Sequence, residues 1–494
     1  MTEIAIIGGG AAGAAVFGAL LHRGGHAHAH WITGPAATGR GVAYATADER
    51  HLLNVRAAGM GLYSDQEEDF VQYAKRHRAN VRDTDFLPRR LFGDFIESQL
   101  QQRIETARRD GRRFSVHAQE TLRIEPRNGG YRVWLADGSA MEADAVVLAL
   151  GALAPRPLRA VGDDALASGA YELDPWRLPQ RSRAPRRLLV IGTGLTAADT
   201  LLSAAHRWPH TELVAVSRHG LLPFVHSPLP LAPYPWQQDL NDSLLACSGV
   251  PPMLKLVRTT LRAAPQTDWR SVIDGMRPIN ARLWQGLTLA QRKQFLHHLR
   301  WLWEAARHRT APQTTQTLQQ LLDEGRLQVH PARVLGVDGR GPLDVTVRAR
   351  ANQIQSTLQA DLVVQATGLD TAAAYTEHTL LAQLLRDGLA VADPLQLGVA
   401  AQPDGRLLDA HGEVQPGLYA IGSLLRGNLW ECTAMPEICA AAHALALTLA
   451  SGPATPAPCA DAPAGGTATT AHRGNNVVTL ARHNDMAHGE FAGR

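Results

Sequence analysis

Two glycine-rich segments have the spacing that lets a backbone wrap closely around a pyrophosphate. Their key positions are Gly8, Gly10, Ala12 and Gly13 in the first segment and Gly192, Gly194, Thr196 and Ala197 in the second. Glycine at these spacings permits a tight turn, and the helix that follows can offer its N-terminal N–H groups to the phosphates. We therefore expect binding of two dinucleotides, with a plain glycine turn as the alternative for either segment.

Each glycine segment lies between a predicted strand and a predicted helix. In the first unit an apolar run at 4–7 precedes the glycines, a run rich in Ala and Leu at 14–21 follows them, and a second strand spans 27–32. The second unit repeats this order, with strands at 187–191 and 213–216 and a helix that continues to about residue 206. A buried apolar strand, a glycine turn and a helix are the context in which this motif binds a nucleotide.

A second pair of segments indicates that the duplication continues. Residues 114–151 alternate like a small sheet and end in ADAVVLALG at Gly151, and residues 327–368 do the same and end in ADLVVQATG at Gly368. Two separated motifs that recur in the same order indicate a repeated fold rather than coincidence. We expect an apolar strand near 417–422 and a helix from about 436 to 450 to complete the first unit.

Several further segments match a known family. They are GRGVAY at 39–44, HLLNV at 51–55, ATG at 366–368 and the region from Gly422 through WECT at 430–433. With these segments and the two glycine motifs, residues 1 to about 450 resemble flavoproteins with two dinucleotide-binding domains, and among them proteins related to bacterial N-hydroxylating monooxygenases. The resemblance implies that the first glycine motif holds FAD and the second holds the nicotinamide nucleotide. Gly151 and Gly368, which end the matching segments of the two units, are also predicted cofactor contacts.

The predicted fold is therefore α/β, with two Rossmann-like dinucleotide-binding domains for FAD and NADPH and an inserted helical segment. We assign residues 1–160 plus 361–451 to the FAD domain, 161–226 plus 313–360 to the NADPH domain, and 227–312 to the helical insert. Residues 452–494 are rich in Pro, Ala, Gly and Thr, so we expect a mobile tail without a catalytic role.

The residue that ends the second strand of each unit meets the adenosine ribose in folds of this kind. In the first unit it is Thr33, where an acidic residue is usual, so we expect a hydroxyl hydrogen bond in place of a carboxylate. In the second unit it is Ser217, followed by Arg218, and a guanidinium beside a serine suits a 2′-phosphate. We therefore predict NADPH rather than NADH, with a surface arginine as the alternative.

The resemblance also implies which residues line the flavin. Its ribityl chain and ring would contact a loop that contains Arg40, His51, Leu52, Leu53 and Asn54. Asn54 is the candidate polar contact, and its alternative role is that of a turn residue. Gly422 and Thr433 would present backbone N–H groups to the pyrimidine edge. Trp430 would either cover the isoalloxazine ring or fill the core, and Asn54 and Trp430 are the predicted catalytic residues.

The helical insert is crowded with Trp, Arg and His. We assign substrate contacts to four of its residues, Arg270, Arg277, His308 and Arg309. Arginines beside tryptophans can clamp a small carboxylate against aromatic walls. At helical spacing the same residues could equally form an amphipathic face that pairs with solvent or with a partner.

The resemblance predicts an FAD-dependent, NADPH-consuming monooxygenase that N-hydroxylates a small amine or amino acid through a peroxyflavin. Its partners would be a small-molecule substrate and dioxygen. One alternative is a flavin-dependent oxidoreductase that passes electrons to a quinone or protein acceptor without oxygen insertion. Another is a nucleotide-sensing scaffold without catalytic activity.

Composition disfavours several other classes of protein. The chain has 49 basic and 46 acidic residues without a long run of either sign, so it lacks the charge pattern of a nucleic-acid-binding protein. Its four cysteines contain no Cys-x-x-Cys pair, which disfavours a disulfide framework, a zinc ribbon and a dithiol redox centre. No apolar run suits a signal peptide or a membrane span, so we expect a cytoplasmic protein and leave homo-oligomerisation open.

No metal site is predicted from the sequence. His26, His28 and His30 lie in or beside a predicted strand, where alternate side chains share a face. We interpret these histidines as structural, with adventitious metal capture as the alternative.

Overall fold

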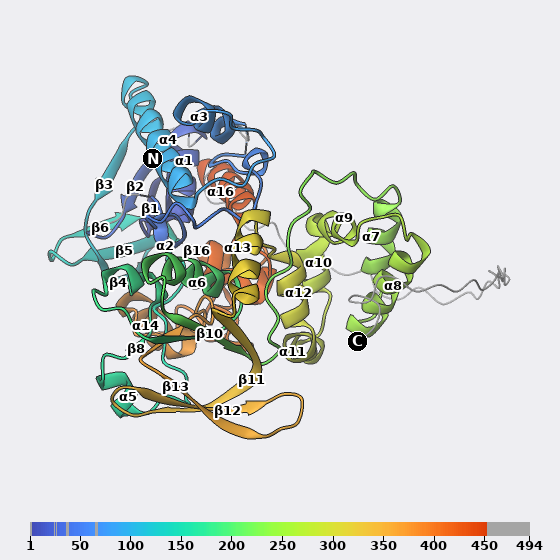
Figure 1. The fold of residues 1–494 in the computed structure, drawn as a ribbon. Helices are drawn as coiled ribbons and strands as arrows, with labels where there is room; N and C mark the ends of the chain where they lie inside the picture. The colour runs from blue at the N-terminus through green and yellow to red at the C-terminus, as the bar shows by residue number, and fades with distance from the viewer. Residues whose placement is uncertain (1, 24, 26, 36–38, 65–67, 452–494) are drawn as a thin grey trace.

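Strands from both ends of the chain build one largely parallel sheet (Figure 1). The computed structural model describes all residues except 1, 24, 26, 36–38, 65–67 and 452–494. The sheet has six strands, in the spatial order β15 (Arg406–Leu408), β16 (Val414–Ala420), β7 (Ala145–Leu148), β1 (Glu3–Ile7), β2 (His28–Ile32) and β3 (Phe114–His117). Only the β15–β16 pair is antiparallel. Burial on both faces explains the continuous apolar runs of β1 and β7.

Two layers cover this first sheet. One layer consists of the helices α1 (Ala11–Arg23), α4 (Arg89–Arg109) and α16 (Met435–Ala450). The other layer contains α14 (Thr379–Arg386) and an antiparallel sheet of β4 (Thr121–Arg127), β5 (Gly130–Leu135) and β6 (Ala140–Ala143). Helix α16 packs directly against α1, although the two helices come from opposite ends of the chain.

A second sheet repeats this arrangement. Its seven strands follow the spatial order β13 (Gln355–Ala360), β12 (Leu343–Ala349), β11 (Leu327–Asp338), β10 (Glu212–Ser217), β9 (Arg187–Ile191), β14 (Leu362–Gln365) and β8 (Tyr171–Glu172). Helices α6 (Leu195–Arg207) and α13 (Pro312–Asp323) cover one face, and α5 (Asp163–Ala167) lies on the other. In each sheet the strand before the glycine turn, β1 or β9, lies between a second strand, β2 or β10, and a late strand, β7 or β14.

Six α-helices between β10 and α13 form a segment on the right of Figure 1. They are α7 (Gln237–Leu245), α8 (Val250–Ala263), α9 (Trp269–Gly275), α10 (Asn280–Gln285), α11 (Leu289–His298) and α12 (Arg300–Arg307). Their own small core includes Leu244 and Val272. We call these six helices the insert.

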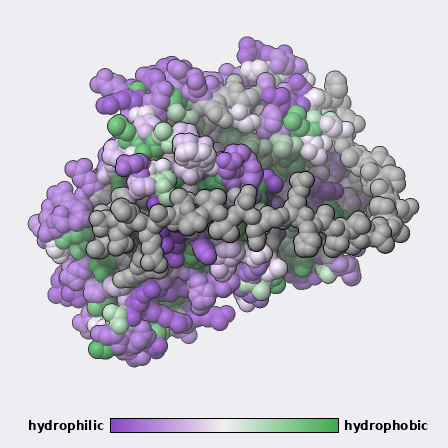
Figure 2. Space-filling view, turned by 90° about the vertical axis from the view of Figure 1, so that its right-hand side faces the viewer, coloured by the Kyte–Doolittle hydropathy of each residue, from purple (hydrophilic) through white to green (hydrophobic). Residues whose placement is uncertain are grey.

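The remaining elements are short. They are α2 (Gly41–Tyr44), α3 (Asp69–His77), α15 (Arg426–Leu429) and the 3-10 helices η1 (Ala57–Gly59), η2 (Pro175–Gln180), η3 (Arg277–Ile279), η4 (Ala373–Tyr375) and η5 (Gly422–Leu425). Among the described residues, no helix is both long and apolar enough to cross a membrane. Hydrophilic side chains predominate on the outer parts of the face in Figure 2, with hydrophobic residues in smaller groups between them.

One predicted domain boundary differs from the observed fold. The sequence analysis placed residues from 361 onward in the first domain, whereas β14 pairs with β9 and β8 in the second sheet. The physical reason is the duplication itself, because β14 repeats the position that β7 takes beside β1. The predicted tail at 452–494 lies outside the described residues.

Candidate functional site

The first glycine turn is closed by backbone contacts that leave no room for side chains at two positions. Gly8 has φ +126°, and a Cβ there would lie 2.2 Å from the carbonyl oxygen of Ala149 at the end of β7. A Cβ at Gly13 would lie 2.0 Å from the carbonyl oxygen of Gly8. Gly10 is different, because its Cβ would make only an ordinary 3.6 Å contact with Gly41. The turn therefore holds α1 against the sheet, and Gly10 has room for a Cβ in ordinary contact with Gly41 at the N-terminus of the helix.

The second glycine turn repeats this geometry. Gly192 has φ +128°, and its Cβ would lie 2.2 Å from the carbonyl oxygen of Ala366 at the end of β14. A Cβ at Gly194 would meet no protein atom within 4 Å. Ala197 takes the position of the third glycine and is fully buried. Each turn thus joins a tight strand end to a helix N-terminus that is open on one side, the arrangement that receives a pyrophosphate.

Two distant segments reach the first glycine turn. The N–H of Gly39 donates to the carbonyl of Gly9 over 2.9 Å. Gly422, the first residue of η5, lies where its Cβ would contact the Cβ of Ala12 at 3.8 Å. The structure therefore brings Ala12 and Gly422, both predicted cofactor contacts, to the first turn of α1.

Arg40 is held by helix α4. Its guanidinium donates to Glu97 at 2.5 and 2.8 Å and to Asp94 at 2.6 Å. The hydrogen bonds from Arg40 to Glu97, followed by those to Asp94, raise the pKa of the guanidinium despite burial. These bonds fix the loop that carries Gly39 and Gly41 beside the glycine turn. A direct contact of Arg40 with a cofactor stays a prediction.

His51 joins the two domains. Its Nε2 lies 2.8 Å from Ser203 Oγ and 3.1 Å from the carbonyl of Asp199, both on α6 of the second unit. Ser203 Oγ also donates to Asp48 over 2.6 Å, and Arg89 forms a 3.0 Å ion pair with Asp199. The sequence analysis assigned His51 to the cofactor and missed its contacts with α6. No local sequence pattern indicates that this loop contacts a helix about 150 residues away.

The loop residues next to His51 face different surroundings. The Leu53 side chain is buried in the first core, and Leu52 pairs with Pro88 in a short β-bridge. The carbonyl of Asn54 accepts a 2.9 Å hydrogen bond from His226 Nε2. Asn54 is therefore fixed to the segment that leads into the insert.

The ends of β2 and β10 carry different polar groups. Thr33 Oγ1 donates to the carbonyl of Gly34 over 2.9 Å. Ser217 Oγ accepts from Thr193 Oγ1 at 2.8 Å and from the N–H of Gly220 at 3.0 Å. The serine hydroxyl thus orders the turn that follows β10.

A cationic and aromatic cluster follows that turn. The His219 ring stacks on Trp301 with a centroid distance of 4.1 Å and an interplanar angle of 9°. Arg350, from the end region of β12, contacts His219, and the side chain of Arg218 is exposed beside it in sequence. Trp301 and Arg350 were not predicted as site residues, because only the fold brings the insert and β12 to the end of β10.

Four predicted cofactor contacts have not yet been placed in the structure. They are Gly151, Gly368, Thr196 and Thr433. Gly151 and Gly368 follow β7 and β14 at corresponding positions, and a Cβ at either would meet no atom within 4 Å. The carbonyl of Thr196 accepts a hydrogen bond within α6, and Thr433 is half-buried in the segment before α16. Their contacts with a cofactor stay predictions.

A cavity of about 230 Å³ lies where Arg56 of the first domain meets the insert and the segment before it, and its lining mixes charged and apolar residues. Its charged and titratable lining consists of Arg56, His226, Arg270, Asp274 and Arg309. The cavity also contains Tyr234 and several apolar residues. It brings together two of the four predicted substrate residues and adds Arg56, His226 and Asp274, which sequence reasoning missed.

Hydrogen bonds position the charged groups of this cavity. Arg56 donates to the carbonyls of Thr84 and Ser227, both at 2.6 Å. Arg309 is only 2% exposed and reaches both carboxylate oxygens of Asp274 at 2.6 Å. Burial, aided by the charge of Arg309, lowers the pKa of His226 to about 4. The cavity therefore combines cationic groups with a neutral imidazole at neutral pH.

Arg270 is oriented by its own helix start. Its guanidinium lies 3.2 and 3.3 Å from the carboxylate oxygens of Asp268 and donates to the carbonyl of Val225 over 2.8 Å. Asp268 also accepts from the backbone N–H of Arg270 at the N-cap of α9. These bonds hold the guanidinium of Arg270 at the cavity wall.

The other two predicted substrate residues, Arg277 and His308, lie near the contact between the insert and the first domain. We call the part of the first domain that the insert contacts, which includes Trp430, Glu431 and Glu437, the docking surface. Arg277 forms a two-pronged ion pair with Glu437 on α16, at 2.5 and 2.8 Å. His308 is half-buried, and desolvation lowers the pKa of its imidazole. Arg277 therefore joins the insert to the first domain, and the substrate contacts of Arg277 and His308 stay predictions.

Trp430 and Glu431 form the centre of the docking surface. Trp430 is 6% exposed and stacks on Trp284 of the insert with a centroid distance of 4.9 Å. Glu431 accepts from Asn280 at 2.9 Å, from Trp303 at 3.0 Å and from Arg307 at 3.1 Å. Packing against Trp284 explains why the Trp430 ring is buried. The catalytic role of Trp430 stays a prediction. No sequence signal marked Glu431, because its three donors lie on two helices, α10 and α12, more than 120 residues before it in the chain.

Comparisons with known proteins agree with this architecture. Residues 5–153 match the sequence model of a family described as FAD-NAD(P)-binding. No curated protein matches the chain. The family match covers the segment that contains the first glycine turn and the loop from Gly39 to Asn54.

Solved structures resemble the chain over most of its length. L-lysine 6-monooxygenase from Pseudomonas syringae has 18% identity and a TM-score of 0.62, and ornithine hydroxylase from Pseudomonas aeruginosa has 15% identity and a TM-score of 0.58. Each match covers 91% of this chain and 99% of the other. Thioredoxin reductase from Lactococcus lactis, at 11% identity and a TM-score of 0.51, covers 91% and 98%. These similarities confirm the predicted α/β fold with two Rossmann-like dinucleotide-binding domains.

Proposed function

We propose that this protein, whose first domain belongs to the FAD-NAD(P)-binding family, is an FAD-dependent monooxygenase that consumes NADPH and N-hydroxylates a small amine or amino acid. The observation that carries the proposal is the duplicated glycine turn, in which Gly8 and Gly192 approach Ala149 and Ala366 with the same 2.2 Å Cβ distance. Two such turns would bind two dinucleotides, NADPH as the electron donor and FAD as the electron acceptor.

The first turn fits the pyrophosphate of FAD. Backbone contacts exclude side chains at Gly8 and Gly13, while a Cβ at Gly10 would meet only Gly41, at 3.6 Å, at the N-terminus of α1. Gly422 meets the same turn from the other end of the domain and would offer its backbone near the flavin. Bound flavin would accept hydride from the nicotinamide and supply the reactivity with dioxygen.

The second turn and the cluster beyond β10 support NADPH as the electron donor. Arg218 and Arg350 provide two guanidinium groups near the strand end that meets the adenosine ribose. The stacked rings of His219 and Trp301 offer a flat surface beside them. Guanidinium groups bind phosphate strongly, whereas a ribose hydroxyl gains little from them.

The coenzyme preference is tested with arginine variants. We expect Arg218→Ala and Arg350→Ala to raise the KM for NADPH at least tenfold and to leave the KM for NADH nearly unchanged. Arg186→Ala is the matched control, because Arg186 is 91% exposed at the start of the second sheet. Equal changes for the two coenzymes would refute the assignment of the 2′-phosphate.

The cavity at the insert is the proposed substrate site. Its volume of about 230 Å³ is below the ~300–1,000 Å³ of drug-sized ligand sites, so it suits a molecule of amino-acid size. Arg270 and Arg56 would bind a carboxylate, and Asp274 with the neutral His226 would accept hydrogen bonds from an amine. The His226–Asn54 hydrogen bond connects this cavity to the loop that we assign to the flavin.

The reaction as a whole balances without a further reductant. An amine, dioxygen, NADPH and a proton give a hydroxylamine, water and NADP⁺. The protein residues would bind and orient the substrate. Arg270→Met should raise the KM for the amino acid more than tenfold, with Lys255→Met, an exposed residue of the insert, as the control.

The cysteines count against electron transfer to a disulfide. The sequence has no Cys-x-x-Cys pair, and dithiol exchange needs a reactive thiolate. Cys432 is buried, donates to the carbonyl of Gly422, and has its pKa raised to about 12 by desolvation. Cys439 is buried as well and donates to the carbonyl of Leu62 over 3.0 Å.

One experiment separates the proposed reaction from its alternatives. Purified protein is loaded with FAD, and NADPH consumption, oxygen uptake and product masses are recorded against a panel of amines and amino acids. A product heavier by one oxygen atom, formed in proportion to NADPH consumed, supports the proposal. Hydrogen peroxide without an oxygenated product, or NADPH oxidation that depends on an added quinone, contradicts oxygen insertion. Protein that takes up no flavin contradicts the enzyme assignment altogether.

A further inference from the structure

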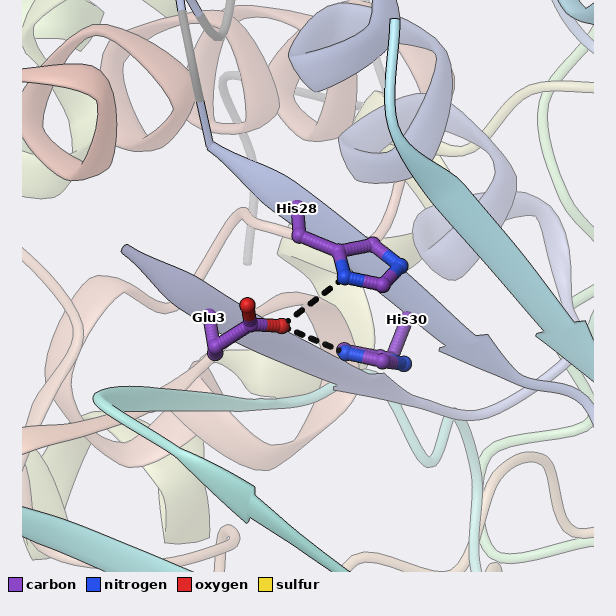
Figure 3. A group of neighbouring side chains, drawn as sticks. All are labelled: Glu3, His28 and His30. Carbon is purple, nitrogen blue, oxygen red and sulfur yellow. Dashed lines mark hydrogen bonds and ion pairs between the residues drawn. The ribbon is translucent and has the colours of Figure 1, made fainter. Parts of the chain in front are cut away.

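Three ligand-type side chains converge near the beginning of β1 and β2 (Figure 3). Glu3 lies on β1, and His28 and His30 lie on β2. In the parallel register Glu3 is opposite His28, and Ala5 is opposite His30. Because side chains alternate along a strand, all three residues point to the same face of the sheet. That face is the one on which Ala5, Ile7 and Ile32 contact the second core layer.

The ligand atoms of this cluster lie within bonding reach of one point. His28 Nδ1 is 2.9 Å and His30 Nε2 is 2.8 Å from the same carboxylate oxygen, Oε2 of Glu3. All three ligand atoms lie within 4.8 Å of one another. The side chains of His28 and His30 are 15% and 12% exposed, and that of Glu3 is 31% exposed. A small cation could thus contact all three with modest movement of the side chains.

Groups on β3 orient the two imidazole rings. His28 Nε2 lies 3.0 Å from Ser115 Oγ, and His30 Nδ1 lies 3.3 Å from His117 Nε2. Metal-bound histidines almost always have the ring nitrogen that faces away from the metal held by a hydrogen bond. These contacts leave Nδ1 of His28 and Nε2 of His30 directed at Glu3, which is the arrangement a metal requires.

We propose that Glu3, His28 and His30 form a binding site for a divalent transition metal of the Zn²⁺ type. Zn²⁺ binds imidazole nitrogen and carboxylate oxygen, and three such ligands leave a fourth position for water. Two neutral nitrogen ligands and one carboxylate disfavour Ca²⁺ and Mg²⁺, which take oxygen ligands. The site revises the sequence-based interpretation that these histidines are structural without a metal.

One cation of the protein already lies near this cluster. Arg113 Nη2 is 3.2 Å from His28 Nδ1 and 3.7 Å from Glu3 Oε1. The Arg113 side chain is 54% exposed, so it can swing into solvent when a metal ion takes its place. Binding of the ion would then exchange one positive charge for another beside Glu3.

The position of the site indicates a structural role. Glu3 and His28 begin their strands, whereas Gly8 follows the opposite end of β1. The metal would tie β1 to β2, and the contacts of Ser115 and His117 would extend this tie to the edge strand β3. The site is therefore separate from the proposed FAD site and does not depend on the proposed reaction.

Zinc titration of the full-length protein tests the proposal. Protein is treated with a chelator, dialysed, and titrated with ZnCl₂ by calorimetry, with bound zinc counted by mass spectrometry. We expect the wild type to bind one more zinc ion than Glu3→Gln or His28→Asn, and zinc to raise the melting temperature of the wild type but not of these two site variants. His210→Ala, which removes an exposed imidazole elsewhere, is the matched control and should behave as the wild type.

The variants also separate this site from unspecific binding to the other histidines. Zinc bound elsewhere on the surface is counted equally in the wild type, the control and the site variants. If Glu3→Gln, which keeps the size of the side chain, binds as much zinc as the wild type with the same affinity, the proposal is wrong. Melting curves without zinc show whether each variant is folded, and failure of His28→Asn to fold leaves Glu3→Gln to decide.

Discussion

Gly192 and Gly194 offer a test in which stability and nucleotide binding respond differently. Gly192 has φ +128°, and its Cβ would lie 2.2 Å from the carbonyl oxygen of Ala366. Real Cβ contacts essentially never fall below 3.0 Å, so the two strand ends must separate by about 0.8 Å or more. A strained backbone of this kind costs about 1–3 kcal/mol, and overpacking a further ~1–3 kcal/mol.

Gly194→Ala creates no such conflict. No protein atom lies within 4 Å of its Cβ position, and its φ of −79° suits alanine. Gly194 is the N-cap of α6, where glycine is preferred over alanine by about 1 kcal/mol at most. The added methyl group would, however, occupy the space beside the open N–H groups of α6. Losing one hydrogen bond to a charged phosphate costs about 1.5–3 kcal/mol, which corresponds to about 10- to 150-fold in Kd.

The assay compares melting temperature, bound FAD and the Kd for NADPH in both variants. We expect Gly192→Ala to lower the melting temperature strongly and to weaken NADPH binding, and Gly194→Ala to weaken NADPH binding with a much smaller change in melting temperature. Gly10→Ala is the counterpart in the first turn, where the Cβ makes only a 3.6 Å contact, and it should lose FAD instead. The reasoning is refuted if Gly194→Ala binds NADPH within twofold of the wild type, or if it loses FAD and keeps NADPH.

Three further predictions concern stability and thiol reactivity. His226 has a pKa of about 4 in the folded protein against 6.5 when unperturbed, so the unfolded chain binds more protons between these values and stability rises with pH. Urea unfolding should show the protein about 2 kcal/mol less stable at pH 5 than at pH 7 from this residue, a difference that His226→Gln removes. Native thiol titration should label half-buried Cys247 but neither Cys432 nor Cys439 until the protein is unfolded; rapid labelling of Cys432 would contradict its burial. Glu431→Gln should destabilise the docked insert by about 3–5 kcal/mol, measured by urea unfolding, because it leaves a buried guanidinium without its counter-charge; a loss under 1 kcal/mol would show that the pair is exposed to water.

Sequence alone determined the features that depend on neighbouring residues. The strand, glycine turn and helix of each unit follow from local apolar runs and glycine spacing, and their recurrence gave the duplicated fold. These patterns can be recognised in the sequence because backbone conformation and the periodicity of buried residues depend on residues close together in the chain.

Only the tertiary structure decided which side chains meet across the chain. It placed Gly422 beside Ala12, turned His51 toward α6, and paired Arg277 with Glu437. It also set β1 beside β2 in the register that directs Glu3 toward His28. An arginine or histidine has the same composition and local spacing whether it binds a ligand or another domain. Its role depends on the charges that distant segments bring near it, because ion pairs and hydrogen bonds act over a few ångströms of space and not along the sequence.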